Sequence, residues 1–115
     1  MFSASELPAL SPQELVVRLE SPEPIQLIDV REPEEAAIVS LPHFQLFSLS
    51  QYADWSPLIL DQLDPHVETI VLCHHGIRSA QMCQWLIAQG FTQVKNLSGG
   101  IDAYAWIVDP TLARY

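Results

Sequence analysis

The feature that most constrains the fold is a strand–cysteine–loop–helix succession in the second half of the chain. Residues 69–72, Thr-Ile-Val-Leu, form a short apolar run that is typical of a buried strand. Cys73 ends this run, a loop with Gly76 follows, and Ser79 is a candidate N-cap for a helix over residues 80–89. The succession predicts that loop N–H groups and a helix N-terminus converge on one sulfur atom, an arrangement that favours a thiolate and an anion bound above it.

Strands and helices are also expected to alternate along the rest of the chain. Ser11-Pro12-Gln13-Glu14 has the pattern of a capping box with proline at the first helical position, and predicts a helix to about Leu19. The further expected elements are strands at 25–30, 44–49 and 94–97, and helices at 32–39, 48–63 with a break at Pro57, and 101–107. This alternation predicts an α/β fold with a parallel sheet between two helical layers, and a site at the carboxyl ends of the strands.

Length and composition fit one globular domain over residues 1–115, with a lead-in segment at 1–10 and a core at about 11–108. Hydrophobic residues make up 49% of the 115, which excludes general disorder. No apolar run approaches the roughly 20 residues of a membrane span, and the first six residues lack the basic and apolar regions of a signal peptide. We therefore expect a cytoplasmic protein.

The formal net charge of −9 argues against nucleic acid and anionic membranes as partners. Only five residues are permanent cations, so an arginine at position 78, the last residue of the cysteine loop, is expected to serve the site. The two cysteines do not suggest a disulfide framework. Cys83 is expected to pack as a small apolar residue, and the alternative is a resolving thiol for an oxidised Cys73.

Three segments together resemble one known family. Residues 73–78, Cys-His-His-Gly-Ile-Arg, are similar to the active-site loop of single-domain rhodaneses, which carry a sulfane sulfur as a cysteine persulfide. Residues 27–32, Leu-Ile-Asp-Val-Arg-Glu, and 97–103, Leu-Ser-Gly-Gly-Ile-Asp-Ala, resemble two further family segments in the same order and spacing. The resemblance implies a rhodanese-like three-layer α/β/α fold with a small, mainly parallel central sheet.

The same resemblance implies a sulfurtransferase without a cofactor. Its substrates would be a small sulfur donor such as thiosulfate and an acceptor that is cyanide, a small thiol or a protein thiol, with Cys73 as the catalytic nucleophile. The expected substrate-binding residues are His74, His75, Gly76, Ile77, Arg78 and Ser79. Asp29 and Arg31 are expected to hold the sheet edge near the loop, either as a structural ion pair or through hydrogen bonds at the strand end.

Two features leave details open. Residues 39–44, Val-Ser-Leu-Pro-His-Phe, replace the Gly-His-Ile-x-Gly-Ala segment that is usual in the family, so the resemblance does not define what this segment contributes to the site. The histidines at 74 and 75 could suggest a metal, but adjacent loop residues generally point apart, and His43 and His66 have no ligand spacing. We therefore expect no metal site and two imidazoles, partly cationic near pH 6.5, that shape the substrate entrance.

Two other functions are considered. A phosphatase or arsenate reductase uses a Cys-x5-Arg loop, whereas residues 73 and 78 give Cys-x4-Arg, a shorter loop suited to a smaller group than phosphate. A non-enzymatic or slow sulfur carrier, which binds a partner protein through an acidic surface, is the other alternative.

Overall fold

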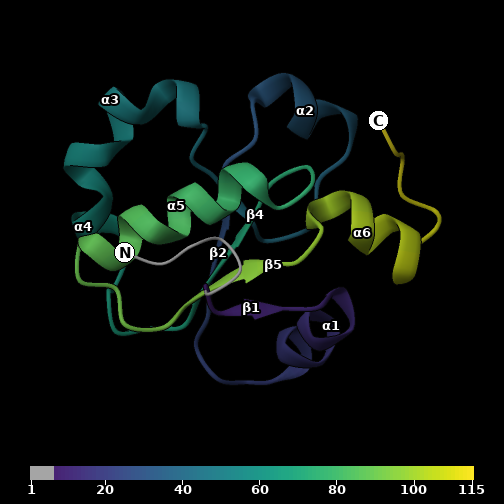
Figure 1. Ribbon diagram of the computed structural model, residues 1–115, viewed down its shortest axis with the longest axis horizontal. Coiled ribbons are helices and arrows are strands. Elements are labelled where there is room, and N and C mark those ends of the chain that lie inside the picture. The colour runs from purple at the N-terminus through teal and green to yellow at the C-terminus, as the bar shows by residue number, and fades with distance from the viewer. Residues whose placement is uncertain (1–6) are drawn as a thin grey trace.

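Parallel strands form the central sheet of the computed structural model, which describes residues 7–115. In these residues the sheet has five strands in the order β1-β5-β4-β2-β3, and every neighbouring pair is parallel. The strands are β1 (Ala9–Leu10), β2 (Gln26–Asp29), β3 (Gln45–Leu46), β4 (Thr69–Leu72) and β5 (Val94–Leu97). The predicted α/β class is confirmed, and β4, which delivers Cys73, lies in the middle of the sheet (Figure 1).

The helices follow the strands much as the sequence predicts. They are α1 (Pro12–Glu20), α2 (Pro33–Ile38), α3 (Tyr52–Trp55), α4 (Ile59–Gln62), α5 (Ile77–Ala88) and α6 (Gly100–Ile107). The Ser11 capping box is present, with reciprocal bonds to Glu14 of 3.1 and 2.8 Å. A 3-10 turn at Ser56–Leu58 separates α3 from α4 at the predicted break. In the described residues, no helix is both long and apolar enough to cross a membrane.

Alternating side chains of β4 bury both faces of the sheet. Val71 and Cys73 face a core layer that includes Met82 and Leu86 of α5, whereas Ile70 and Leu72 face a second layer. The first layer also receives Trp55 and Ile59 from α3 and α4, and the second receives Leu15 of α1 and Ile101 of α6. Figure 1 shows α3, α4 and α5 on one side of the sheet and α1 with α6 on the other. The expected three layers are therefore present.

Two local expectations are wrong. Part of the proposed lead-in segment is a sheet strand, since β1 pairs with β5 through Ala9 and Leu10; residues 1–6 lie outside the described part of the chain. Ser79 does not cap the helix after the loop, because α5 already begins at Ile77 with Gly76 as its N-cap. Gly76 has φ +100°, a backbone conformation that only glycine adopts readily, and it turns the chain into the helix three residues early.

The N-terminus of α6 fastens the loop after β4. The backbone N–H groups of Ile101 and Asp102 donate to the carbonyls of Cys73 and His74, at 2.9 and 3.1 Å. Gly100 permits this approach, since a Cβ built on it would lie 2.5 Å from the Cys73 carbonyl oxygen. The turn at Gly99 and Gly100 thus brings the start of α6 against the loop that follows Cys73.

Candidate functional site

Cys73 lies at the carboxyl end of β4, between the start of α5 and the start of α6. The residue is 1% exposed, so its sulfur is almost entirely enclosed. The backbone N–H of Gly76 donates to Cys73 Sγ at 3.0 Å, and the Ser79 hydroxyl lies 3.2 Å from the same atom. The loop therefore turns an amide, and the first turn of α5 a hydroxyl, inward onto the sulfur, and both are donors that can stabilise a thiolate.

Ser79 also contacts Asn96 of β5, a residue that sequence reasoning did not single out. Its hydroxyl is 2.5 Å from Asn96 Oδ1, while Asn96 Nδ2 donates to the Gly76 carbonyl at 3.0 Å. A hydroxyl carries one proton, so Ser79 donates either to Asn96 or to Cys73, but not to both. A thiol at Cys73 allows Ser79 to donate to Asn96, whereas a sulfur anion attracts the hydroxyl proton toward Sγ. The Ser79 hydroxyl can thus change its hydrogen-bond acceptor from Asn96 to Sγ when the sulfur becomes an anion.

Arg78 belongs to the first turn of α5 and pairs with Glu35 of α2. Two parallel bonds join them, Nη1 to Oε1 at 2.5 Å and Nη2 to Oε2 at 2.9 Å. The bonds from Arg78 lower the pKa of Glu35 to about 2, and Glu35 in turn raises the pKa of Arg78. Arg78 is therefore fixed and always charged, and its field reaches Cys73. It braces α5 against α2 instead of binding loop carbonyls.

Asp29 and Arg31 form the expected ion pair, and it is buried. Arg31 Nη2 donates to Asp29 Oδ2 at 2.7 Å, and neither residue is more than 3% exposed. Burial opposes the charge on Arg31, but bonds to Asp29 and to Tyr115 outweigh it and raise its pKa. Arg31 also donates to the carbonyl of Val39 at 2.8 Å. The segment at 39–44, which departs from the family pattern, thus still supplies a backbone acceptor beside the site.

Tyr115 links the two arginine–carboxylate pairs. Its hydroxyl donates to Glu35 Oε2 at 2.8 Å and accepts from Arg31 Nη1 at 3.1 Å. Its ring stacks on the His74 ring, with centroids 3.8 Å apart and planes inclined by 7°. Residues 35, 78 and 115 are far apart in the sequence, and no local pattern marks their meeting.

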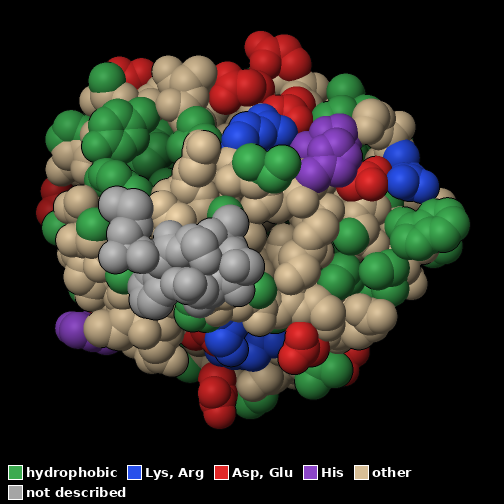
Figure 2. Space-filling model, viewed as in Figure 1, with side chains coloured by type: hydrophobic (Ala, Val, Ile, Leu, Met, Phe, Trp, Pro, Cys, Tyr) green, Lys and Arg blue, Asp and Glu red, His purple; other side chains and the backbone are tan. Residues whose placement is uncertain are grey.

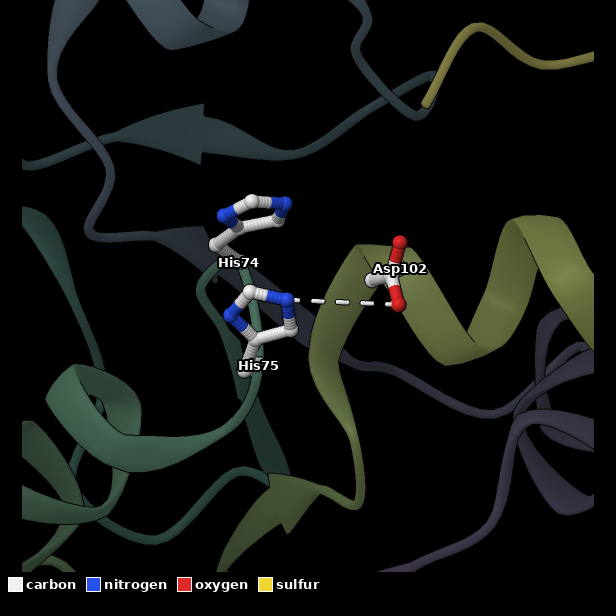
Figure 3. Close-up of side chains that lie close together, drawn as sticks. All are labelled: His74, His75 and Asp102. Atoms are coloured by element: carbon white, nitrogen blue, oxygen red, sulfur yellow. Dashed lines mark ion pairs between the residues drawn. The ribbon is translucent and has the colours of Figure 1, made fainter. Parts of the chain in front are cut away.

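His74 and His75 do not point apart, contrary to expectation. Their rings stack with centroids 3.8 Å apart, and both turn a nitrogen toward Asp102 on α6 (Figure 3). His75 Nε2 lies 3.9 Å from Asp102 Oδ2. Burial and the neighbouring His75 lower the pKa of His74 below its ordinary value, so its surroundings disfavour the cationic imidazole.

Of the other predicted site residues, some contact the Cys73 sulfur and one is exposed to solvent. Gly76 and Ser79 contact Sγ, whereas the Ile77 side chain is exposed to solvent. Cys83 is buried in the core under α5, and burial raises its pKa to about 12, so it packs as a small apolar residue. In Figure 2, histidine, acidic and basic side chains gather on the face where α2, α5 and α6 meet.

Comparisons with known proteins converge on one family. The family model described as the rhodanese-like domain matches residues 11–105. The chain is 51% identical over 90 residues to rhodanese-like/PpiC domain-containing protein 12, chloroplastic, of Arabidopsis thaliana; this match covers 78% of the chain and 30% of that protein. It is 33% identical over 99 residues to the putative sulfurtransferase YtwF of Bacillus subtilis, covering 86% of the chain and 91% of YtwF.

A solved structure agrees with these matches. The crystal structure of a rhodanese-like domain protein from Staphylococcus aureus superposes with a TM-score of 0.76 at 27% identity. The superposition covers 95% of this chain and 99% of that one. The similarity therefore extends over nearly the full length of both chains.

Proposed function

The chain belongs to the rhodanese-like domain family, and from this premise we propose that it transfers a sulfane sulfur through a persulfide on Cys73. The supporting observation is the pair of inward donors on the sulfur, Gly76 N–H at 3.0 Å and the Ser79 hydroxyl at 3.2 Å. Both stabilise an anion at Sγ, and the thiolate is the nucleophilic form of cysteine.

The reaction has two covalent steps. The Cys73 thiolate attacks the outer sulfur of a donor such as thiosulfate, the S–S bond of the donor breaks, and sulfite leaves with the bonding electron pair. The S–S bond of the persulfide is about 2 Å long, so the outer sulfur lies that far from Sγ. Cyanide or a thiolate then attacks this outer sulfur, and Cys73 leaves as a thiolate. Gly76 and Ser79 stabilise the Cys73 anion at the start and at the end.

Steady-state kinetics test this proposal. Full-length protein is assayed with thiosulfate and cyanide, each varied at several concentrations of the other. A double-displacement reaction gives parallel double-reciprocal lines, and Cys73→Ser abolishes turnover whereas Cys83→Ser retains it. Aryl-phosphate hydrolysis is measured beside it. Phosphatase activity above sulfur transfer would overturn the assignment, and is not expected because Glu35 already holds Arg78 in a bidentate pair.

A sulfur carrier with a protein acceptor is the second candidate. Its supporting observations are the 1% exposure of Cys73 and the Arabidopsis relative, which is named for a PpiC domain as well as a rhodanese-like one and of which this chain spans 30%. A carrier forms the persulfide stoichiometrically but turns over slowly with cyanide. Transfer of labelled sulfur to candidate protein thiols faster than to cyanide supports the carrier.

The setting we propose is the cytoplasm, where thiols stay reduced. Both cysteines are free and buried, as this setting allows. One relative is named as chloroplastic, so fractionation of the source cells is the decisive measurement. Recovery of the protein in an organelle fraction would contradict the proposal.

A further inference from the structure

Two imidazoles and one carboxylate meet at the entrance to the cysteine loop. One donor atom from each of His74, His75 and Asp102 lies within 4.8 Å of the other two. Within residues 7–115, this is the one group of three such side chains that meets in this way. Two ligands of a tetrahedral zinc ion lie about 3.3 Å apart, so the 3.9 Å between His75 Nε2 and Asp102 Oδ2 is closed by a small side-chain rotation.

The backbone holds these three residues together independently of their side chains. The Asp102 N–H donates to the His74 carbonyl at 3.1 Å, and the Ile101 N–H donates to the Cys73 carbonyl at 2.9 Å. His74 and His75 are consecutive, and their rings are stacked. The donor groups are therefore already assembled, and an ion that binds them has little chain ordering to impose.

A further observation concerns His74 itself. Its Nε2 atom is buried and has no hydrogen-bond partner within the described chain. An unpaired buried nitrogen is unfavourable, and a neutral imidazole nitrogen is a common ligand of transition metals. Figure 3 shows a nitrogen of this ring on the side of His75 and Asp102.

Arg114 competes for the same carboxylate. It makes two bonds to Asp102, of 3.0 and 3.1 Å, but the Arg114 side chain is 48% exposed. An exposed pair of this kind contributes little free energy, so an ion can displace it. The net charge of −9 also favours an incoming cation.

We infer that His74, His75 and Asp102 form a binding site for a divalent transition-metal ion, of which Zn²⁺ is the test case. Two imidazoles and a carboxylate suit Zn²⁺ and its late first-row neighbours, and three protein ligands leave one position for water or another ligand. The site lies beyond the proposed sulfur transfer and does not depend on it, because binding is measured without a sulfur donor.

Calorimetric titration of full-length protein with Zn²⁺ tests the inference, with Co²⁺ absorption spectra as a second readout. We expect one ion per chain and a Co²⁺ spectrum without thiolate charge-transfer bands. His75→Ala and Asp102→Asn should each weaken binding at least tenfold, a scale set by about 10–100-fold for loss of even the outer partners of metal ligands. Both side chains are partly exposed, so both variants should fold, and circular dichroism checks this.

Three further variants separate this site from other sources of binding. Cys73→Ser should bind with unchanged affinity, which distinguishes the site from zinc held by the thiolate. His66→Ala, a histidine elsewhere on the chain, is the matched control and should also bind unchanged. Arg114→Gln should bind more tightly, because the competing cation is gone. Wild-type affinity in His75→Ala and Asp102→Asn, or lost binding in Cys73→Ser, would overturn the inference.

Discussion

The two ends of the central sheet both carry arginine–glutamate pairs, but they use them differently. At the amino ends of the strands, Arg18 of α1 and Lys95 of β5 both pair with Glu68. At the carboxyl ends, Arg78 pairs with Glu35 beside the loop that holds Cys73. The first group fastens α1 to the sheet, whereas the second fixes a permanent cation within electrostatic reach of a sulfur.

The difference follows from the topology of a parallel sheet. Helices α5 and α6 both begin near the carboxyl ends of the strands that precede them, so their free N–H groups gather at that end. At the amino end, a depression of about 440 Å³ is lined by residues that include Arg18 and His66, but no cysteine. The comparison teaches that an inward backbone N–H and an enclosed cysteine sulfur distinguish the carboxyl end better than concavity does.

The largest expected effect concerns the glycines at the two ends. Gly100→Ala should lower the free energy of unfolding by at least about 3 kcal/mol, because φ is +65° and the new Cβ would meet the Cys73 carbonyl. Gly90→Ala, at φ +102° with no atom within 4 Å, should lower it by only about 1–2 kcal/mol. Urea unfolding measures both. Equal losses would mean that the approach of α6 to the loop is not tight.

A second effect depends on pH. The pKa of Glu35 is about 2 in the fold, against an ordinary value of 4.5. The stability from its pairing is therefore fully present above about pH 4.5 and is lost as the pH falls through 2. Glu35→Gln should be less stable than wild type by about 2–3 kcal/mol at pH 7, and the difference should shrink between pH 4.5 and 2. A constant difference across this range would contradict the pairing.

Substitutions of Arg78 and Arg18 distinguish a cation that affects sulfur transfer from one that only holds a helix against the sheet. Arg78→Gln should lower kcat/KM for sulfur transfer about tenfold, roughly 1.4 kcal/mol of transition-state stabilisation, because a fixed cation near the sulfur is lost. Arg18→Gln removes the corresponding partner of Glu68 and should change kcat/KM less than about twofold. If both variants lost activity equally, the two ends would not differ in the way described.

The smallest expected effects come from removing one buried hydroxyl group at each end of the sheet. Ser79→Ala removes one donor from Cys73 Sγ and should slow sulfur transfer by about threefold to tenfold. Thr69→Val removes a buried hydroxyl at the amino end of β4, where it bonds Val67 and Gln26. Each variant should lose about 1 kcal/mol of stability, and only Ser79→Ala should lose activity. Activity loss in Thr69→Val as well would indicate a general structural effect.

Local sequence patterns were sufficient for most of the fold. Residues 69–72 form the predicted strand because an apolar run of that length is stable only between two covered faces. The Ser11 capping box and the break at Pro57 are local chemistry, and both are where the sequence indicates. The start of α5 was missed because the positive φ of Gly76 begins the helix earlier than the more familiar serine cap.

The surroundings of the sulfur were much less predictable. Asn96 occupies an ordinary strand position, and its importance arises only because β5 lies beside β4 and α5. Glu35 meets Arg78 across 43 residues, and Tyr115 meets Arg31 across 84. Such contacts are set by how the elements pack, and neither motif spacing nor periodicity records them.

Mass spectrometry of the intact protein after thiosulfate treatment tests the central claim most directly. The claim is that the loop after β4 holds the Cys73 sulfur as an anion able to accept a second sulfur. We predict one added sulfur atom in wild type and in Cys83→Ser, removed by cyanide, and none in Cys73→Ser. An unmodified wild type, or an added sulfur that persists in Cys73→Ser and disappears in Cys83→Ser, would contradict the account.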